Sequence, residues 1–367
     1  MTKKHRRSTQ IKTSPAPGPL PVKSKFLSSL LRPALIVLIF GLVYLAFDRS
    51  LAAMLKPLLL NTPLPSNGNK MMVATAAQAE AYIFGDSRAE NHYDPQIFSR
   101  ATGLSFYNCG ISGRGFINIY FTVSYLLQHC HPKLFIIDIN LHQLDYDPDR
   151  NRYELRSFAP FQDDMPNYAK LYKAEEAAHR AYAYRMVDRL CESYRFNEHT
   201  GTILAGLAGI KPQHPNGFFT QNRVYHPDPT ARRGKYFYWR DDFTILYLIN
   251  TIKVANQHGV KVILCIGPHY RDDTGFKPSN LEWYFIRCVR EIAIKMKLPL
   301  IELFEWRYPA LQDINHYANQ DHLNREGAAI FSQLATVDLL NILAQHDATT
   351  FFESRYYPKM DPKLFPF

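Results

Sequence analysis

The chain has 367 residues, of which 46% are apolar, 14% aromatic and 21% charged. This composition excludes a disordered chain, a collagen-like fibre and a disulfide-rich miniprotein, and the length allows one large domain or two ordinary ones. The net charge of +10 would suggest a nucleic-acid partner, but eight of the 43 Lys and Arg residues precede the first acidic residue, Asp48. The remainder is nearly neutral, so the charge belongs to one N-terminal tail and we expect no nucleic-acid partner.

An apolar segment follows this basic tail of residues 1–25 and predicts a transmembrane anchor over residues 26–48. The run from Pro33 to Phe47 carries no charge, and the apolar residues before Arg32 complete the roughly 20 residues that a bilayer requires. By the positive-inside rule, the basic tail stays in the cytoplasm. The sequence thus predicts a single-pass protein of the cell membrane whose main domain is exported, to the periplasm or another extracytoplasmic space.

Two alternatives compete with an uncleaved anchor. Ser50, Leu51 and Ala52 form a tolerable small-x-small cleavage site, which would fit a secretory signal peptide. A basic region of about 30 residues is long for such a peptide. A buried core helix is the other alternative, and the one-sided distribution of charge argues against it.

The cysteines are odd in number and widely spaced, at Cys109, Cys130, Cys191, Cys265 and Cys288. Because they include no Cys-x-x-Cys pair, neither a zinc ribbon nor a thioredoxin-type site is predicted, and we expect no metal. In an exported domain, one or two disulfides stay open as an alternative to free thiols.

Short apolar runs alternate with helical stretches over residues 80–346, after a predicted linker at 49–79. We expect strands near residues 81–84, 104–107, 134–139, 260–266 and 298–303. We expect helices near residues 114–130, 241–258, 279–296 and 325–345. This alternation predicts an α/β fold with a parallel sheet covered on both faces. Residues 150–240 interrupt the alternation and predict a mostly helical insertion over the edge of the sheet, and an aromatic tail occupies 347–367.

The first predicted strand runs into Gly85, Asp86 and Ser87. In an open parallel sheet, ligands bind beyond the carboxyl ends of the strands, so Ser87 stands where a nucleophile would be useful. A serine hydroxyl needs a base that removes its proton. The alternative is a simple turn in which Asp86 or Ser87 caps the following helix.

The next two predicted strands also end in residues that suit acyl chemistry. Gly110 follows the second strand, and its backbone N–H could face a reacting oxygen because no side chain covers it. Asn140 follows the third strand and could donate a hydrogen bond through its amide. With the Ser87 N–H, these groups would form an oxyanion hole. Taken singly, each is more often a turn glycine or a capping Asn.

His322 lies in a loop just before the last predicted helix, where it could reach back to Ser87 as a general base. Asn319 stands three residues earlier, and Asp321 directly precedes the histidine. A lone histidine in a loop is usually solvated. Here it completes a set of four positions at successive element ends, which favours a site.

Together, Gly85-Asp86-Ser87, Gly110, Asn140 and His322 resemble the SGNH (GDSL) hydrolase superfamily. The phrases at 108–113, 267–269 and 321–328 are similar to its membrane-anchored branch, which includes the D-alanyl transfer protein of teichoic acids and alginate O-acetylation proteins. The similarity spans residues 80–145 and 255–345 and leaves the insertion unmatched. It implies a three-layer, flavodoxin-like domain with a five-stranded parallel sheet. It also implies that Ser87 is the nucleophile, His322 the base, and Gly110 and Asn140 the oxyanion donors.

Two positions depart from this pattern. The family usually has Asp where this chain has Asn319, and an amide cannot stabilise the imidazolium by charge. In serine proteases the equivalent change costs several orders of magnitude in rate. Asp321 is the acid next to His322 in the sequence. The Gly-x-Asn-Asp phrase that usually surrounds the second oxyanion donor is absent around Asn140.

The resemblance implies a membrane-anchored, serine-dependent acyltransferase or esterase, without a cofactor, that acts on acyl groups of a cell-envelope polysaccharide or related polymer. An integral-membrane acyltransferase would be the partner that supplies the acyl group. The alternative is a catalytically degraded scaffold or assembly protein of polysaccharide modification or export, which Asn319 favours.

Overall fold

The computed structural model describes residues 24–62, 70–144, 147–165, 168, 191–210, 216–227, 242–270, 280–305 and 308–345. Most of the predicted basic tail and the whole aromatic tail at 347–367 lie outside the described residues.

The core of the protein is a five-stranded sheet in which every neighbouring pair is parallel. Its strands are β1 (Ala81–Phe84), β2 (Phe106–Asn108), β3 (Leu134–Asp138), β4 (Lys261–Ile266) and β5 (Leu300–Glu302). The order β2-β1-β3-β4-β5 is that of flavodoxin-like sheets, and it reverses direction between β1 and β3. The predicted α/β class and parallel sheet are confirmed, and each strand overlaps its predicted range.

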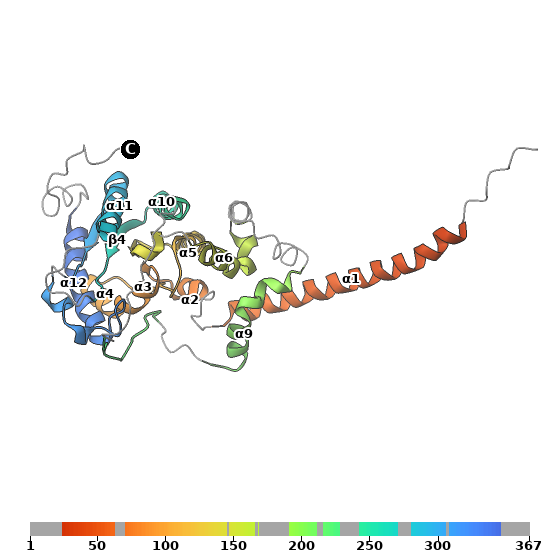
Figure 1. The fold of residues 1–367 in the computed structure, drawn as a ribbon, viewed down its shortest axis with the longest axis horizontal. Coiled ribbons are helices and arrows are strands. Elements are labelled where there is room, and N and C mark those ends of the chain that lie inside the picture. The colour runs from red at the N-terminus through yellow and green to blue at the C-terminus, as the bar shows by residue number, and fades with distance from the viewer. Residues whose placement is uncertain are drawn as a thin grey trace, which may run out of the picture.

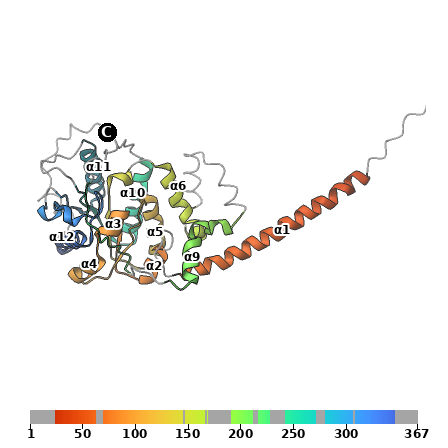
Figure 2. The ribbon, with the colours of Figure 1, turned by 60° about the horizontal axis from the view of Figure 1, so that its bottom comes forward.

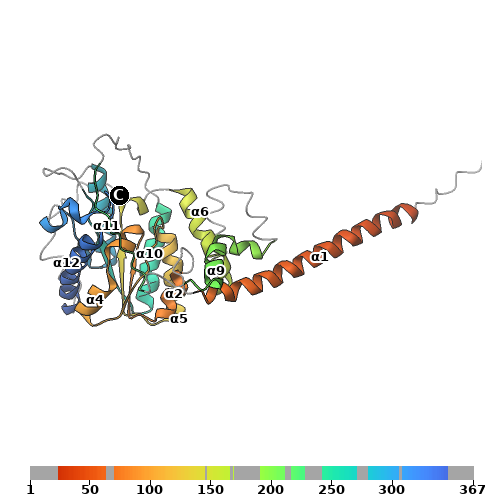
Figure 3. The ribbon, with the colours of Figure 1, turned by 90° about the horizontal axis from the view of Figure 1, so that it is seen from below.

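Helices cover both faces of the sheet (Figure 3). One face carries α3 (Ser87–His92), α4 (Pro95–Thr102) and α12 (Arg325–Ala344). The other carries α2 (Lys70–Ala77), α5 (Phe116–His129), α10 (Asp242–Gln257) and α11 (Asn280–Met296). Alternate residues of β1 point to opposite layers: Tyr82 and Phe84 pack with α5 and α10, whereas Ala81 and Ile83 pack with α12. Both faces are therefore dry, as a parallel sheet requires.

Short 3₁₀ helices complete the described structure, at η1 (Leu141–Leu144), η2 (Ala159–Asp164), η3 (Ser193–His199), η4 (Pro309–Leu311) and η5 (Ile314–His316). The five cysteines all lie in described segments, and all are free.

Helix α1 (Ser24–Leu60) is a continuous helix of 37 residues that projects from the body of the protein (Figure 1). Its residues from Leu31 to Ala46 are exposed, and the segment is long and apolar enough to cross a membrane. Helix α12 also has the length and composition of a span, but it packs against the sheet through Phe331, Ala335 and Leu339. It is therefore a core helix.

The structure differs from the predicted linker over 49–79. Helix α1 continues to Leu60, where Leu59 is buried in the core, and α2 buries Met71 and Ala74 beside α5. The proline, asparagine and glycine residues of this stretch, which suggested a linker, fall mainly in 61–69. In the predicted linker, residues 61–62 and 78–79 are described outside helices, and residues 63–69 lie outside the described residues.

The predicted insertion contains α6 (Pro148–Ser157), η2, η3 and α9 (Thr200–Leu207) in its described parts. These elements pack on α5 and on the body-side end of α1, as Figure 2 shows for α6 and α9. The expected contact with the edge of the sheet comes from another part of the insertion, because Asn108 of edge strand β2 donates its backbone N–H to Asn216 O at 3.0 Å.

Asp48 joins α1 to the insertion. Its carboxylate accepts hydrogen bonds from Glu192 N at 2.6 Å, Ser193 N at 3.0 Å, Ser193 Oγ at 2.6 Å and the Cys191 thiol at 3.0 Å. Arg49 adds an ion pair with Glu192 at 2.7 Å. Because hydrogen bonds to a charged group are stronger than neutral ones, this contact fixes the start of η3 on α1.

Replacing Asp48 with Ala should release this segment. We expect the Cys191 thiol in the full chain, in detergent micelles, to react with a maleimide at least about fivefold faster, since hydrogen bonds to a carboxylate are lost. Mass spectrometry of the labelled peptides gives the rate for each cysteine. Cys288, which is also half-buried but lies on α11, is the internal control. Equal rates for Cys191 in both proteins would contradict the role given to Asp48.

Candidate active site

The turn after β1 places Ser87 at the first residue of α3. Gly85 allows the turn, because a Cβ there would lie 2.6 Å from Ala89 Cβ and 3.0 Å from Asp138 Cβ. Asp86 is the N-cap of α3, and its Oδ1 accepts the Arg88 N–H at 2.9 Å. Ser87 therefore sits at the carboxyl end of β1, at the point where the strand order reverses.

His322 reaches Ser87 from the opposite end of the sequence. Its Nε2 lies 2.7 Å from Ser87 Oγ, across a separation of 235 residues. Two neighbours hold the histidine loop in place: the Leu323 N–H donates to buried His92 Nε2 at 3.0 Å, and Asn324 caps α12. The two residues that the sequence predicted as nucleophile and base thus lie in hydrogen-bonding contact.

Asn319 contacts Nδ1 of His322, the ring nitrogen that does not face Ser87. Its Oδ1 accepts the backbone N–H groups of Asp321 and His322, both at 2.9 Å, and lies 2.9 Å from His322 Nδ1. Two backbone donors identify the amide atom as oxygen, so His322 Nδ1 must carry the proton that it shares with this acceptor. His322 Nε2 then has a free lone pair, and the Ser87 hydroxyl donates to it.

The surroundings of His322 keep its ring neutral. Burial lowers its pKa below the ordinary histidine value, and the charges of Arg88 and Arg223 act in the same direction. The negative charges of Asp321 and Asp86 oppose them without reversing the shift. A neutral imidazole near pH 7 is the form that accepts a proton from serine.

Asp321 contributes to the site through its charge alone. Its side chain is exposed, and in the described part of the chain it makes no hydrogen bond to His322. Its backbone N–H is bound by Asn319 Oδ1 instead. The acceptor on the histidine ring is therefore Asn319, and the sequence left the choice between the two residues open.

Close packing against α3 requires a glycine at position 110. A Cβ at this position would lie 2.3 Å from Glu90 N and 2.8 Å from Ala89 Cβ on α3. Its N–H, predicted as an oxyanion donor, instead donates to Asn108 Oδ1 at 2.8 Å. The Gly110 amide would thus reach a reacting oxygen only after this bond opens.

Asn140, the other predicted donor, is buried at the end of β3. Its Oδ1 accepts the Gln143 N–H at 3.1 Å, and one amide N–H donates to Asp86 Oδ2. Neither the second Asn140 amide N–H nor the Ser87 N–H at the start of α3 has an acceptor among the described residues. These two groups are the candidate donors to a reacting oxygen.

A buried charged network lies behind Ser87 that sequence reasoning missed. Tyr93 OH donates to Asp138 Oδ1 at 2.6 Å, and burial raises the pKa of Asp138 to about 6. The Arg88 guanidinium is buried nearby, and its Nε and Nη2 atoms have no hydrogen-bond partner in the described segments. Gly267 makes room for it, since a Cβ there would lie 2.9 Å from Arg88 Nη2. Two features of the sequence could have indicated this network: Arg88 directly follows Ser87, and Gly267 directly follows β4.

Lys70 is a second residue that sequence reasoning missed. It is buried, pairs with Glu90 at 3.1 Å and donates to the Gly110 carbonyl. Burial lowers its pKa. It lay in the predicted linker, where no pattern pointed to it.

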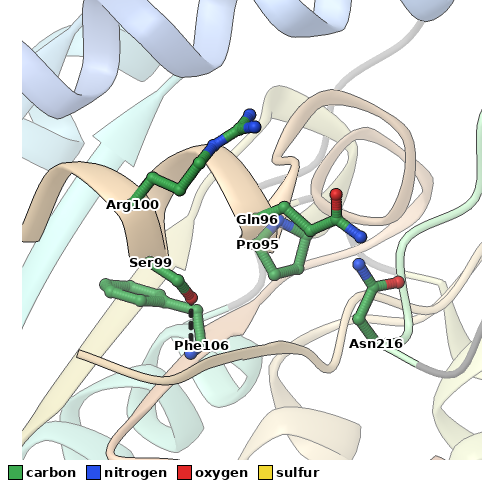
Figure 4. Close-up of a pocket in the computed structure, with 6 residues that line it drawn as sticks. All are labelled: Pro95, Gln96, Ser99, Arg100, Phe106 and Asn216. Carbon is green, nitrogen blue, oxygen red and sulfur yellow. Dashed lines mark hydrogen bonds between the residues drawn. The ribbon is translucent and has the colours of Figure 1, made fainter. Parts of the chain in front are cut away.

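A surface cavity of about 360 Å³ lies beside α4 (Figure 4). Its lining residues are Pro95, Gln96, Ser99, Arg100, Phe106 and Asn216. None of the predicted site residues lines it.

No protein-family model matches the chain, and no curated protein matches its sequence.

Replacing Asn319 with Ala should reduce the reactivity of Ser87 toward a fluorophosphonate by about 100-fold or more, because the histidine loses the acceptor that fixes its tautomer. Asn319→Asp keeps the acceptor and adds a charge that stabilises the imidazolium, so its rate should equal or exceed that of the native chain. Rates are followed by intact-protein mass spectrometry. An unchanged rate in Asn319→Ala would contradict the orienting role of the amide.

The labelling rate should rise with pH as His322 loses its proton, with a midpoint below the ordinary histidine value of about 6.5, and stay flat above neutrality. The variant Asp138→Asn serves as the control, because Asp138 titrates in the same range with a pKa of about 6. The midpoint should persist in that variant. A midpoint above pH 7 would contradict the assignment of His322 as a buried neutral base.

Proposed function

We propose that the protein is a membrane-anchored, exported acyltransferase or esterase of the SGNH type, which works through an acyl-serine. The supporting observation is the hydrogen-bonded chain from Ser87 through His322 to Asn319, with its tautomer set for proton removal. A parallel α/β sheet with the nucleophile at its switch point agrees with this proposal.

In the first half of the reaction, Ser87 Oγ attacks the carbonyl carbon of an ester while His322 Nε2 takes the hydroxyl proton. The carbonyl oxygen becomes an oxyanion, which the Ser87 N–H and the free Asn140 amide N–H would stabilise. When the tetrahedral intermediate collapses, the bond to the leaving oxygen breaks and His322 gives that oxygen the proton. The product is an acyl-serine and a free alcohol.

In the second half, His322 removes a proton from an acceptor hydroxyl, which attacks the acyl-serine carbonyl. The bond from the carbonyl to Ser87 Oγ then breaks, and the serine recovers its proton from His322. A glycan hydroxyl as acceptor gives transfer, and water gives hydrolysis. The geometry of the three residues supports both.

Helix α1 favours transfer at the cell envelope. It is long and apolar enough to cross a membrane, and the basic residues before it favour a cytoplasmic N-terminus. The domain would then lie outside the cytoplasm beside the membrane. There it would take an acyl group from an integral-membrane acyltransferase and act on an envelope polysaccharide or related polymer.

One observation favours the alternative, a scaffold of polysaccharide modification or export that binds without catalysis. The Gly110 N–H is occupied by Asn108, so the oxyanion hole lacks one of its expected donors. Removing one donor from an oxyanion hole costs about 10²–10³ in rate. The enzyme proposal and the scaffold alternative therefore differ in whether Ser87 is reactive.

The full chain in detergent micelles should form a covalent adduct with a fluorophosphonate at Ser87, because His322 can remove the serine proton. Ser87→Ala and His322→Ala should abolish the adduct. Ser124→Ala on α5 and His258→Ala, whose side chain is exposed, are the matched controls and should label normally. Peptide mapping locates the adduct. A folded native chain that does not label would contradict the enzyme proposal and support the scaffold.

A further inference from the structure

One segment of the insertion lies across the site. Residues 216–227, here called the strap, begin beside β2, where Asn108 N donates to Asn216 O at 3.0 Å. The Phe219 N–H then donates to Glu90 O on α3 at 2.9 Å. The strap therefore runs from the second strand onto the helix that carries the nucleophile.

Three further contacts fix the rest of the strap between α3 and the segment that carries His322. Gln221 Nε2 donates to Asn91 Oδ1 at 3.2 Å, and Gln221 O accepts the Arg325 N–H at the start of α12 at 2.8 Å. Two residues beyond Arg223, the Tyr225 N–H donates to Tyr317 O at 2.8 Å. Arg223 is thus held between two anchors, one on each side.

Arg223 is exposed at this position, and among the described residues it has no ion-pair or hydrogen-bond partner. The contacts on either side place Arg223 of the strap between α3 and the loop of His322, and its positive charge acts to lower the pKa of His322. Asp321 is the exposed acid nearest in sequence to His322, and no ion pair joins it to Arg223. The other cation that acts on His322, Arg88, is buried and cannot meet a substrate.

We propose that Arg223 is a specificity-determining residue that binds an anionic group, a carboxylate or a phosphate, on the molecule whose acyl centre reacts at Ser87. A guanidinium presents a planar fork of N–H donors that matches the oxygens of either anion. The strap holds the backbone of Arg223 between α3 and the loop of His322, so an anionic group bound there would lie near the reacting ester. This inference rests on the proposed acyl chemistry and names the charge of its substrate.

The test compares two fluorophosphonates of equal length, one with a neutral alkyl end and one with a terminal carboxylate. Ser87 Oγ attacks phosphorus, the P–F bond breaks and fluoride leaves, so both probes report the same step. The ratio of their second-order rates on the full chain cancels changes in the reactivity of the serine. We expect the native chain to favour the anionic probe and Arg223→Gln to reduce this ratio by about 5- to 30-fold.

Arg223→Lys should keep part of the preference, because it retains the charge and loses the fork. Arg325→Gln is the matched control: its side chain is also exposed and its backbone contacts the strap, and its ratio should not change. In the native chain, raising the salt concentration from about 0.05 M to 0.5 M should also reduce the ratio, since salt screens exposed charges.

The outcomes separate the two proposals. Labelling by both probes with equal ratios in the native chain and Arg223→Gln would overturn the role of Arg223 and leave the enzyme proposal standing. A native preference for the anionic probe that salt does not reduce would also count against it. No labelling of the native chain by either probe would overturn the acyl chemistry, and the inference with it.

Discussion

The position of Ser87 depends on one buried carboxylate, that of Asp86. Asp86 caps α3 through the Arg88 N–H and accepts the Asn140 amide through its other oxygen, so it joins the ends of β1 and β3. These are the two strands between which the sheet reverses its order. Leaving a buried hydrogen-bonding group unpaired costs about 1–3 kcal/mol, so this link resists opening. The Gly85-Asp86-Ser87 turn is therefore a structural clamp as well as the carrier of a hydroxyl.

Asn319 has an amide where the resembled pattern has an aspartate, and the hydrogen bonds of its oxygen explain how it can still orient His322. Orientation of the histidine needs only an acceptor, and Asn319 Oδ1 is held by two backbone N–H groups that leave it facing Nδ1. Stabilisation of the imidazolium needs negative charge, which Asp86 and Asp321 supply at longer range. Burial still dominates, so the resting histidine is neutral and the cost falls on the charged intermediate. In the proposed mechanism, orientation of His322 would thus come from Asn319, and charge stabilisation from Asp86 and Asp321.

The sequence predicted what depends on local pattern and strand order. Continuous apolar runs located the strands, and the carboxyl ends of those strands located Ser87, Asn140 and the loop of His322. The sequence did not predict residues whose role depends on tertiary packing. Lys70 is buried against Glu90 and the Gly110 carbonyl, which lie 20 and 40 residues further along the chain, so the residues around it do not reveal these partners. Gly110 was chosen for its amide, whereas the structure shows a steric requirement against α3.

The insertion, which had no match in the sequence resemblance, connects the anchor to the site. Its segment 191–210 is fixed to α1 through Asp48, and its segment 216–227 lies along α3 and beside the loop of His322. Only six peptide steps separate Ile210 from Asn216, and an extended chain covers at most about 3.6 Å per residue, so these segments lie within roughly 22 Å of each other. The segment that contacts α1 and the strap that runs along α3 therefore belong to one stretch of the insertion. The insertion thus adds a second connection between α1 and the domain, beside the packing of Leu59 in the core.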